Sequence, residues 1–231
     1  MALIVRLDVD RPYGREPWLR HALSRLSSDF FLPRLESMAY LAELKWMLGL
    51  LNAQGVRAHL FFRRCTLPSE SALELIRQGG HEMGLHLEDS RSYSTFLREK
   101  QALEAALGQP VYSFSKHGSR GIKYGLHHYA PYEPEKYMEW GARAGMKLFL
   151  GNMEDPSLPA VSRDGCVCFP SAFWLEPSWR NVTLHPVSWL LSRMETHDVV
   201  MLAHPENIKA SPRLEEDFMT VIRAGKQQVA L

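Results

Sequence analysis

Leu7-Asp8-Val9-Asp10 ends the first apolar run of the sequence and places two carboxylates two residues apart. In a β-strand, side chains two residues apart point to the same face, so Asp8 and Asp10 share one face. Two neighbouring carboxylates repel each other unless a positive group lies between or beside them. A divalent metal held by one carboxylate, with a water activated by the other, would remove that cost. The stretch therefore predicts a strand whose end carries a metal or proton-transfer site.

Later apolar runs end in histidines, which can also bind a metal or transfer a proton. Gly80-His81-Glu82-Met83-Gly84-Leu85-His86 is one such run, and Leu202-Ala203-His204 is another. His117 follows a further short apolar segment. In a parallel α/β fold, the loops that leave the C-terminal ends of the strands converge. We therefore expect five side chains to face one pocket: Asp8, Asp10, His86, His117 and His204.

Short aliphatic or β-branched runs alternate with longer stretches of helical period, which is typical of repeated βα units around a parallel sheet. The predicted strands cover residues 2–8, 56–62, 81–87, 111–116, 146–150, 166–170 and 199–203. The predicted helices cover residues 35–54, 69–78, 94–107, 134–144, 187–196 and 212–224. Seven strands separated by helices predict an α/β fold, either a barrel or a curved sheet. A chain of 231 residues is long enough for one well-buried domain, so we expect residues 1–231 to form a single domain.

Composition excludes some partner classes. Lys and Arg number 27 against 26 Asp and Glu, so the bulk charge gives no attraction to nucleic acid or to an anionic membrane, and any preference for a charged ligand must be local. No segment approaches the about 20 apolar residues of a membrane-spanning helix, and the first apolar run is too short for a signal sequence. Three cysteines fit a reduced compartment. We therefore expect a cytoplasmic protein with no integral membrane segment.

Two long connections interrupt the alternation. Residues 11–34 contain five arginines together with Tyr13, Trp18, Phe30 and Phe31, and residues 118–133 carry further basic and aromatic side chains. Connections of this length are usually functional or disordered. Aromatic faces stack on sugar rings, and arginine forks bind carboxylate or phosphate, which favours a binding role. Solvated or partner-facing loops are the alternative.

These residues together resemble the polysaccharide deacetylase family, which is the NodB-homology or carbohydrate esterase family 4 group. Asp8-Val9-Asp10 resembles the acidic pair that ends the family's first strand. Gly80 to His86 matches the family's Gly-His-Glu-apolar-Gly-x-His motif at every fixed position, and Leu202-Ala203-His204 resembles its final motif. The resemblance spans residues 4 to 205. It implies a single-domain distorted (β/α)7 barrel of parallel strands and a metal-dependent de-N-acetylation site.

Carried over residue by residue, the resemblance implies that Asp8 is the general base and His204 the general acid. It also implies that Asp10 and His86 are metal ligands. Ser90 departs from the family, which usually has a second ligand histidine at that position, and Ser113 to Gly118 departs from its Arg-Pro motif. We predict that His117 supplies the third ligand, with water, Glu88, Asp89 or His185 as the alternatives. An Asp-His-His site suits zinc best, with cobalt or nickel as alternatives.

The expected activity is removal of an acetyl group from an acetamido sugar, nucleotide- or lipid-linked, during synthesis of a surface polysaccharide such as O-antigen. We expect Arg11, Lys116 and Trp174 to bind this substrate, although Arg11 could equally pair with Asp8 or Asp10. The sequence leaves the oligomeric state open. Two alternatives remain: a decayed sugar-binding protein on the same fold, and a related hydrolase that acts on another amide. Retention of both carboxylates and His204 argues against decay.

Overall fold

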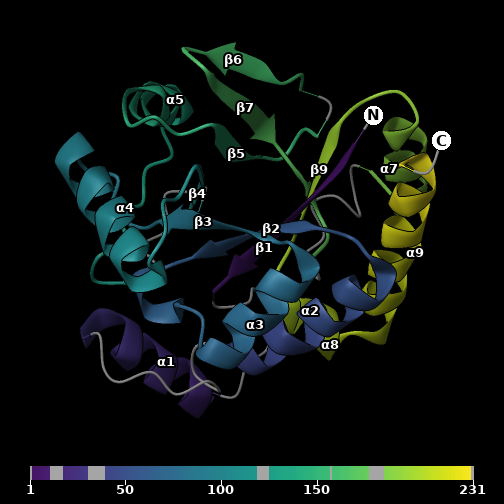
Figure 1. The fold of residues 1–231 in the computed structure, drawn as a ribbon, viewed down its shortest axis with the longest axis horizontal. Helices are drawn as coiled ribbons and strands as arrows, with labels where there is room; N and C mark the ends of the chain where they lie inside the picture. Colours follow the sequence, from purple (N-terminus) through teal and green to yellow (C-terminus); the bar gives the residue numbers. More distant parts are fainter. Residues whose placement is uncertain are drawn as a thin grey trace.

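The computed structural model describes residues 2–10, 18–30, 40–118, 125–156, 158–176 and 185–229. Its centre is a nine-stranded sheet in the order β6-β7-β5-β4-β3-β2-β1-β9-β8, which curls on itself as a half-barrel with helices around it (Figure 1). The seven strands predicted from the apolar runs are all present: β1 (Leu3–Val9), β2 (Ala58–Phe62), β3 (Glu82–Leu87), β4 (Ser113–Lys116), β5 (Leu148–Met153), β7 (Cys166–Ser171) and β9 (Val199–Ala203). They run parallel to their neighbours, as the distorted barrel requires.

Two short strands extend the sheet beyond the prediction. β6 (Val161–Arg163) pairs antiparallel with β7 at one edge, and β8 (Phe173–Trp174) pairs parallel with β9 at the other. A strand of two or three residues has too few positions for a period of two to stand out. β8 nevertheless matters for the site, because Glu176, two residues after its end, contacts His204.

Beyond the first long connection, the described helices are α2 (Leu41–Gln54), η1 (Arg64–Thr66), α3 (Glu70–Gly79), α4 (Tyr93–Leu107), α5 (Pro134–Arg143), α7 (Val187–Met194), α8 (Pro205–Ala210) and α9 (Pro212–Val229). A helix is present in each of the six predicted stretches, the last of which continues to Val229, and the short helices η1 and α8 were not predicted. α2 begins after Tyr40, whose left-handed φ of 58° is not helical, so the predicted start at residue 35 is not confirmed. Residues 31–39 lie outside the described part of the chain.

The first long connection is not an irregular loop throughout, because α1 (Trp18–Phe30) is a helix of 13 residues. The prediction of a loop over residues 11–34 is therefore wrong for residues 18–30. Leu19, Leu23, Leu26 and Phe30 recur at helical spacing, and the structure leaves them exposed. The described part of the second connection, residues 125–133, contains neither helix nor strand, as expected.

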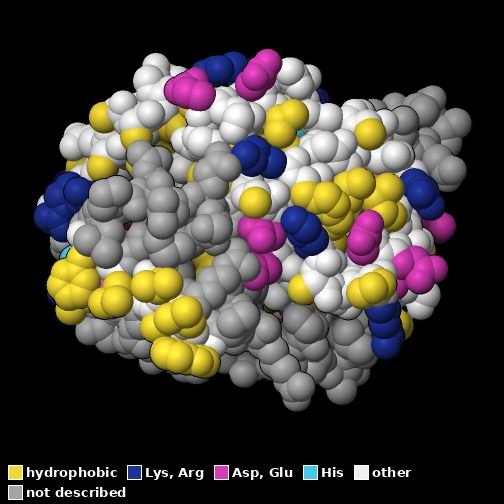
Figure 2. Space-filling model, turned by 90° about the horizontal axis from the view of Figure 1, so that it is seen from below, with side chains coloured by type: hydrophobic (Ala, Val, Ile, Leu, Met, Phe, Trp, Pro, Cys, Tyr) yellow, Lys and Arg dark blue, Asp and Glu magenta, His cyan; other side chains and the backbone are white. Residues whose placement is uncertain are grey.

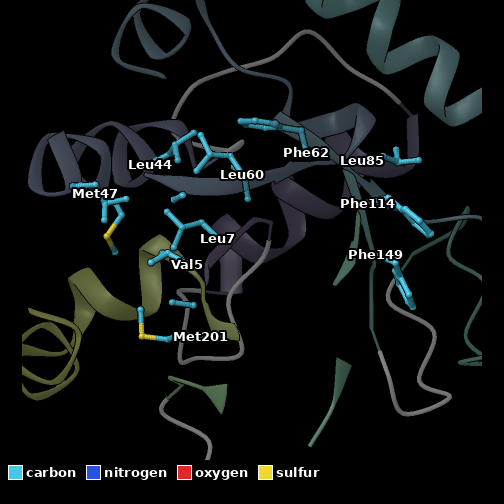
Figure 3. Packing of buried hydrophobic residues seen from close by; sticks show 14 of the residues in the cluster. Val5, Leu7, Leu44, Met47, Leu60, Phe62, Leu85, Phe114, Phe149 and Met201 are labelled. Atoms are coloured by element: carbon cyan, nitrogen blue, oxygen red, sulfur yellow. The ribbon is translucent and has the colours of Figure 1, made fainter. Parts of the chain in front are cut away.

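The side chains of each strand divide between two apolar clusters. On β1, Val5 and Leu7 face α2 and contact the larger cluster, in which Leu44 and Met47 of that helix are buried (Figure 3). The alternate residues face into the curl of the sheet, where Phe61, Leu150, Trp174, Val200, Leu202 and Ala172 form a second, smaller cluster. Phe61 and Leu202 of this inner cluster lie in register with Asp8 and Arg6 of β1. Apolar and polar side chains therefore share the inner face of the sheet.

None of the described helices is both long enough and apolar enough to cross a membrane.

Candidate metal centre and its proton-transfer groups

The period of two in the strands brings the predicted site residues to one place. Asp8 and Asp10 point into the curl from the end of β1, and His86 does so from β3. His117 directly follows β4, and His204 directly follows β9. All five residues are buried, with at most 5% of their surface exposed. The structure therefore brings together the five side chains that the sequence predicts to share a pocket.

Asp10 is the centre of the cluster. Its Oδ2 atom lies 2.6 Å from His117 Nδ1 and 3.0 Å from His86 Nε2, while its Oδ1 atom lies 3.0 Å from His204 Nε2. Three residues, Asp10, His86 and His117, each offer one possible ligand atom, and these atoms lie within 4.8 Å of one another. Burial raises the pKa of the Asp10 carboxyl, but its contacts with the rings of His117 and His204 outweigh burial and hold that pKa well below its usual value.

The surroundings of the two ring ligands suit them to a metal. His86 Nδ1 lies 2.7 Å from Ser115 Oγ, so a proton on Nδ1 leaves the lone pair of Nε2 directed at Asp10. Burial, followed by the nearby Arg63 guanidinium, lowers the pKa of His117 well below its usual value. A neutral ring is the form that coordinates a metal. A carboxylate with two neutral imidazoles therefore fits a divalent ion such as zinc.

Asp8 is held by an arginine from its own strand. Arg6 Nε and Nη2 donate to the two Asp8 oxygens at 2.9 and 2.7 Å, and Arg6 Nη1 donates to the carbonyls of Leu150 and Gly151 at 2.9 and 2.8 Å. Arg6 is fully buried. The bidentate contact compensates the carboxylate charge and fixes its plane. Arg6 is thus a partner of Asp8, whereas the expected pairing of Arg11 concerns a residue outside the described part of the chain.

His204 is oriented by a carboxylate behind it. Its Nδ1 lies 2.5 Å from Glu176 Oε1, and its main-chain N–H donates to the same oxygen at 3.0 Å. Asn207 Nδ2 donates to the other Glu176 oxygen. Burial lowers the pKa of the His204 ring, but the Glu176 charge and then the Asp10 charge raise it well above its usual value. His204 therefore carries a proton at neutral pH, with Nε2 directed at the cluster.

A layer of buried charges supports the His117 side of the cluster. Lys116 is fully buried, and its Nζ donates to the His117 carbonyl at 2.6 Å and to the Tyr129 carbonyl at 3.0 Å. Burial lowers the pKa of Lys116 to about 7. Arg63 pairs with Glu88, and both side chains are buried. These contacts hold the main chain at His117 in place.

The remaining predicted site residues lie in different surroundings. Arg11 is outside the described residues. Trp174 belongs to the inner apolar cluster and is 8% exposed. The substrate contacts expected of Arg11, Lys116 and Trp174 stay predictions, and the observed bonds of Lys116 show that it positions His117.

The alternatives to His117 as third ligand are engaged elsewhere. Glu88 pairs with Arg63, and Asp89 pairs with Arg91. His185 stacks on Trp189, with 4.1 Å between the ring centroids. Ser90, at the family's histidine position, is fully buried and lies 3.0 Å from the Tyr137 hydroxyl. Of these candidate residues, His117 is the one that the structure places beside Asp10 and His86.

Two groups of the site went unnoticed in the sequence, for different reasons. Arg6 lies two residues before Asp8, so strand alternation alone was a sufficient signal to place it on the same face. Glu176 follows a strand of only two residues and lies 28 positions from His204, so no local pattern links them. Only the pairing of β8 with β9 brings the carboxylate to the ring.

Comparison with known proteins gives the same fold. No protein-family model matches the chain, and no curated protein matches it. Among solved structures, a variant of a Bacillus anthracis family 4 carbohydrate esterase pseudoenzyme with restored activity superposes with a TM-score of 0.50. It is 14% identical, and the alignment covers 98% of this chain and 63% of that one.

Two other family 4 esterases are similar at lower scores. One from Streptomyces lividans, in complex with acetate, has a TM-score of 0.47 at 14% identity. The alignment covers 99% of this chain and 88% of the Streptomyces chain. One from Streptococcus mutans has a TM-score of 0.44 at 16% identity, and the alignment covers 98% of this chain and 82% of the Streptococcus chain. At these identities the likeness concerns the backbone only. The parallel curled sheet and the superposition on the restored-activity variant give the chain the NodB-like barrel fold of the family 4 carbohydrate esterases.

Proposed function

We propose that the protein is a divalent-metal-dependent hydrolase that removes an acetyl group from an acetamido sugar. The observation that carries the proposal is the arrangement around Asp10. A three-residue donor set lies between a buried carboxylate, Asp8, and a protonated imidazole, His204. Hydrolysis of an amide needs a base for the attacking water and an acid for the leaving amine, on either side of an electrophilic centre.

Asp10, His86 and His117 would hold the metal. A bound divalent ion polarises the amide carbonyl and lowers the pKa of the attacking water. Zinc fits a set of three protein ligands from one carboxylate and two imidazoles, and cobalt or nickel could replace it. The neutral state of His117 and the Ser115 contact of His86 support this assignment.

The side chains of the protein would move the protons. Asp8, clamped by Arg6, accepts the proton of the attacking water. His204, with its proton held by Glu176 and Asp10, donates to the nitrogen of the leaving amine. The Arg6 and Glu176 pairs keep both groups oriented, so the arrangement needs little reorganisation during the reaction.

The substrate class follows from the chemistry and from the expected place of the protein in the cell. An acetamido sugar in surface-polysaccharide synthesis, such as that of O-antigen, is the proposed target, linked to a nucleotide or to a lipid. Arg11 would contact the phosphate groups, and Trp174 would contact the sugar. A cytoplasmic location accords with this substrate and remains part of the proposal.

The metal assignment is tested by elemental analysis of purified protein after zinc is added and the excess removed. His117→Ala should sharply lower the bound zinc. His185→Ala is the matched control, since His185 was an alternative ligand and stacks on Trp189 instead. Zinc stoichiometry that is unchanged in His117→Ala and reduced in His185→Ala would reverse the assignment.

The reaction is tested by measuring acetate, formate and ammonia released from a panel of acetamido sugars and other amides with zinc, cobalt or nickel present. Acetate release that is lost in Asp8→Asn and in His204→Gln supports the proposal. Release of formate or ammonia alone would assign a different carbon-nitrogen hydrolase. Sugar binding without any release would indicate a binding protein, although the retained Arg6–Asp8 and Glu176–His204 pairs argue against that function.

A further inference from the structure

α1 exposes a continuous row of large apolar side chains. Leu19, Leu23, Leu26 and Phe30 are 53, 44, 47 and 65% exposed, and Trp18 at the start of the helix is 77% exposed. Their spacing of four, three and four residues keeps the row on one face of a helix. Figure 2, which views the molecule from the side where α1 lies in Figure 1, shows hydrophobic side chains gathered at the lower left. Large apolar residues that gather on a surface usually mark a binding face.

The attachment of α1 leaves this row uncovered. Near its C-terminal end, Asp29 Oδ1 accepts the Leu126 main-chain N–H at 2.7 Å, and His127 Nε2 donates to the Asp29 carbonyl at 3.0 Å. The helix also contacts η1. These contacts fix the helix to the body of the protein without burying its exposed row.

The charge of this segment identifies the chemistry of its partner. Residues 11–34 contain five arginines against two acidic residues, whereas the whole chain has a net charge of only +1. A helix with a Trp, Leu and Phe face inside an arginine-rich segment is typical of helices that lie in the interface of an anionic bilayer. A second copy of the chain is less suitable, because pairing this face with itself would bring the same excess of positive charge together.

We propose that α1 is an interfacial helix that docks the protein on the surface of an anionic lipid bilayer. The apolar row would insert at the level of the acyl chains and headgroups, and the net positive charge of the segment would favour an anionic surface.

The position of α1 relates the proposed docking to the Asp10 cluster. η1 follows the carboxyl end of β2, and residues 125–127 follow β4. α1 therefore lies at the same end of the sheet as the Asp10 cluster. Docking would bring this end of the barrel close to the bilayer, where a lipid-linked sugar would be presented. This use rests on the proposed function, whereas the docking itself does not.

The proposal is tested by vesicle flotation of the full chain with phosphatidylcholine vesicles and with vesicles that also contain phosphatidylglycerol. Binding should require the anionic lipid and weaken as salt rises from about 0.1 M to about 0.5 M, because surface charges are screened. Leu23→Glu/Leu26→Glu should reduce partitioning by about tenfold or more, since two apolar side chains no longer insert. Its matched control is Tyr112→Glu/Val161→Glu, which changes side chains of similar exposure (54 and 44%) outside α1 and should bind like the wild type.

Two further readouts separate the outcomes. Bilayer binding should blue-shift tryptophan fluorescence in the wild type, and Trp18→Phe should remove most of that shift. His117→Ala should bind vesicles like the wild type, so a failed metal assignment does not affect this test. Absence of wild-type binding, or equal binding by the Leu23→Glu/Leu26→Glu variant with an unchanged melting temperature, overturns the proposal. So does a wild-type dimer that this variant dissociates.

Discussion

Arg6 divides its guanidinium between one carboxylate and two main-chain carbonyls across the barrel, and all of these groups are buried. A charge of this kind is tolerated inside a protein only while its partners stay in place. The same residue therefore serves the stability of the inner layer and the orientation of Asp8. Its position two residues before Asp8 makes this double role a direct consequence of strand alternation.

Removal of Arg6 should be costly, because it leaves the Asp8 carboxylate buried without its partner. Arg6→Met should lower the free energy of unfolding by about 3–5 kcal/mol, measured by chemical denaturation. Arg6→Met/Asp8→Asn should recover much of this loss, since the uncompensated charge is gone. A double variant that is as unstable as the sum of the two single variants would show that the pair is not coupled.

Glu176 can be tested separately from the metal ligands, because it contacts His204 and Asn207 and none of the three predicted ligands in the described structure. Glu176→Gln should lower kcat for acetate release by about 10²–10⁴-fold, since the proton of His204 is no longer held and oriented. Zinc content and KM should change little. Loss of zinc in this variant would mean that Glu176 supports the metal site rather than proton transfer.

β3 shows how one element combines packing with the site. Gly84 lies two residues before His86, on the same inner face, and a Cβ atom built there would lie 2.5 Å from the Phe61 ring and 2.6 Å from Ser113 Oγ. The glycine of the motif is therefore required by the close approach of β2 and β4 beneath His86. The motif position has a structural reason as well as a functional one.

Gly84→Ala should consequently destabilise the protein by about 1–3 kcal/mol, because the buried Phe61 ring has no space to move. It should also weaken zinc binding through displacement of His86. Gly49→Ala is the control, since a Cβ on that α2 glycine meets nothing within 4 Å and should not destabilise the fold. Equal melting temperatures for the two variants would contradict this account.

The sequence predicted the buried strands well, because each carries a run of apolar residues that the sheet buries on both faces. It predicted α1 poorly. The apolar residues of α1 have helical spacing, but they face solvent, so the arginine and aromatic content of residues 11–34 suggested a binding loop instead. β8 was also missed, and Glu176 with it, because the pairing of two residues with β9 is decided by tertiary contacts.

Across the whole molecule, stability and site depend on the same curled sheet. The inner apolar cluster lies inside the curl, and site residues continue along the same inner face, as His204 does after Leu202 of β9. Because the strands are parallel, their carboxyl ends lie on the same side of the sheet, and this fixes the position of the site. Which residues complete it depends on the register of neighbouring strands, such as the pairing of His86 with Ser115 across β3 and β4.

His81 joins α2 to the sheet far from the metal cluster, and it should make global stability depend on pH. Its Nδ1 accepts the Ala58 main-chain N–H at 3.0 Å, and its Nε2 donates to Asn52 Oδ1 at 2.7 Å. Burial lowers the pKa of His81 from 6.5 to about 4, so the folded protein holds the ring neutral. Between these two values the unfolded chain binds more protons than the folded one, and stability is lost as the pH falls.

Thermal unfolding of the wild type and of His81→Gln between pH 7.5 and pH 4 measures this contribution. The wild type should lose stability more steeply than the variant as the pH falls from about 6.5 to about 4, and the two should run parallel above that window. His197→Gln, in which an exposed histidine is replaced, should keep the wild-type slope. Parallel curves for wild type and His81→Gln across the whole range would mean that His81 binds a proton equally well in the folded and unfolded states, which would contradict this account of its buried, neutral ring.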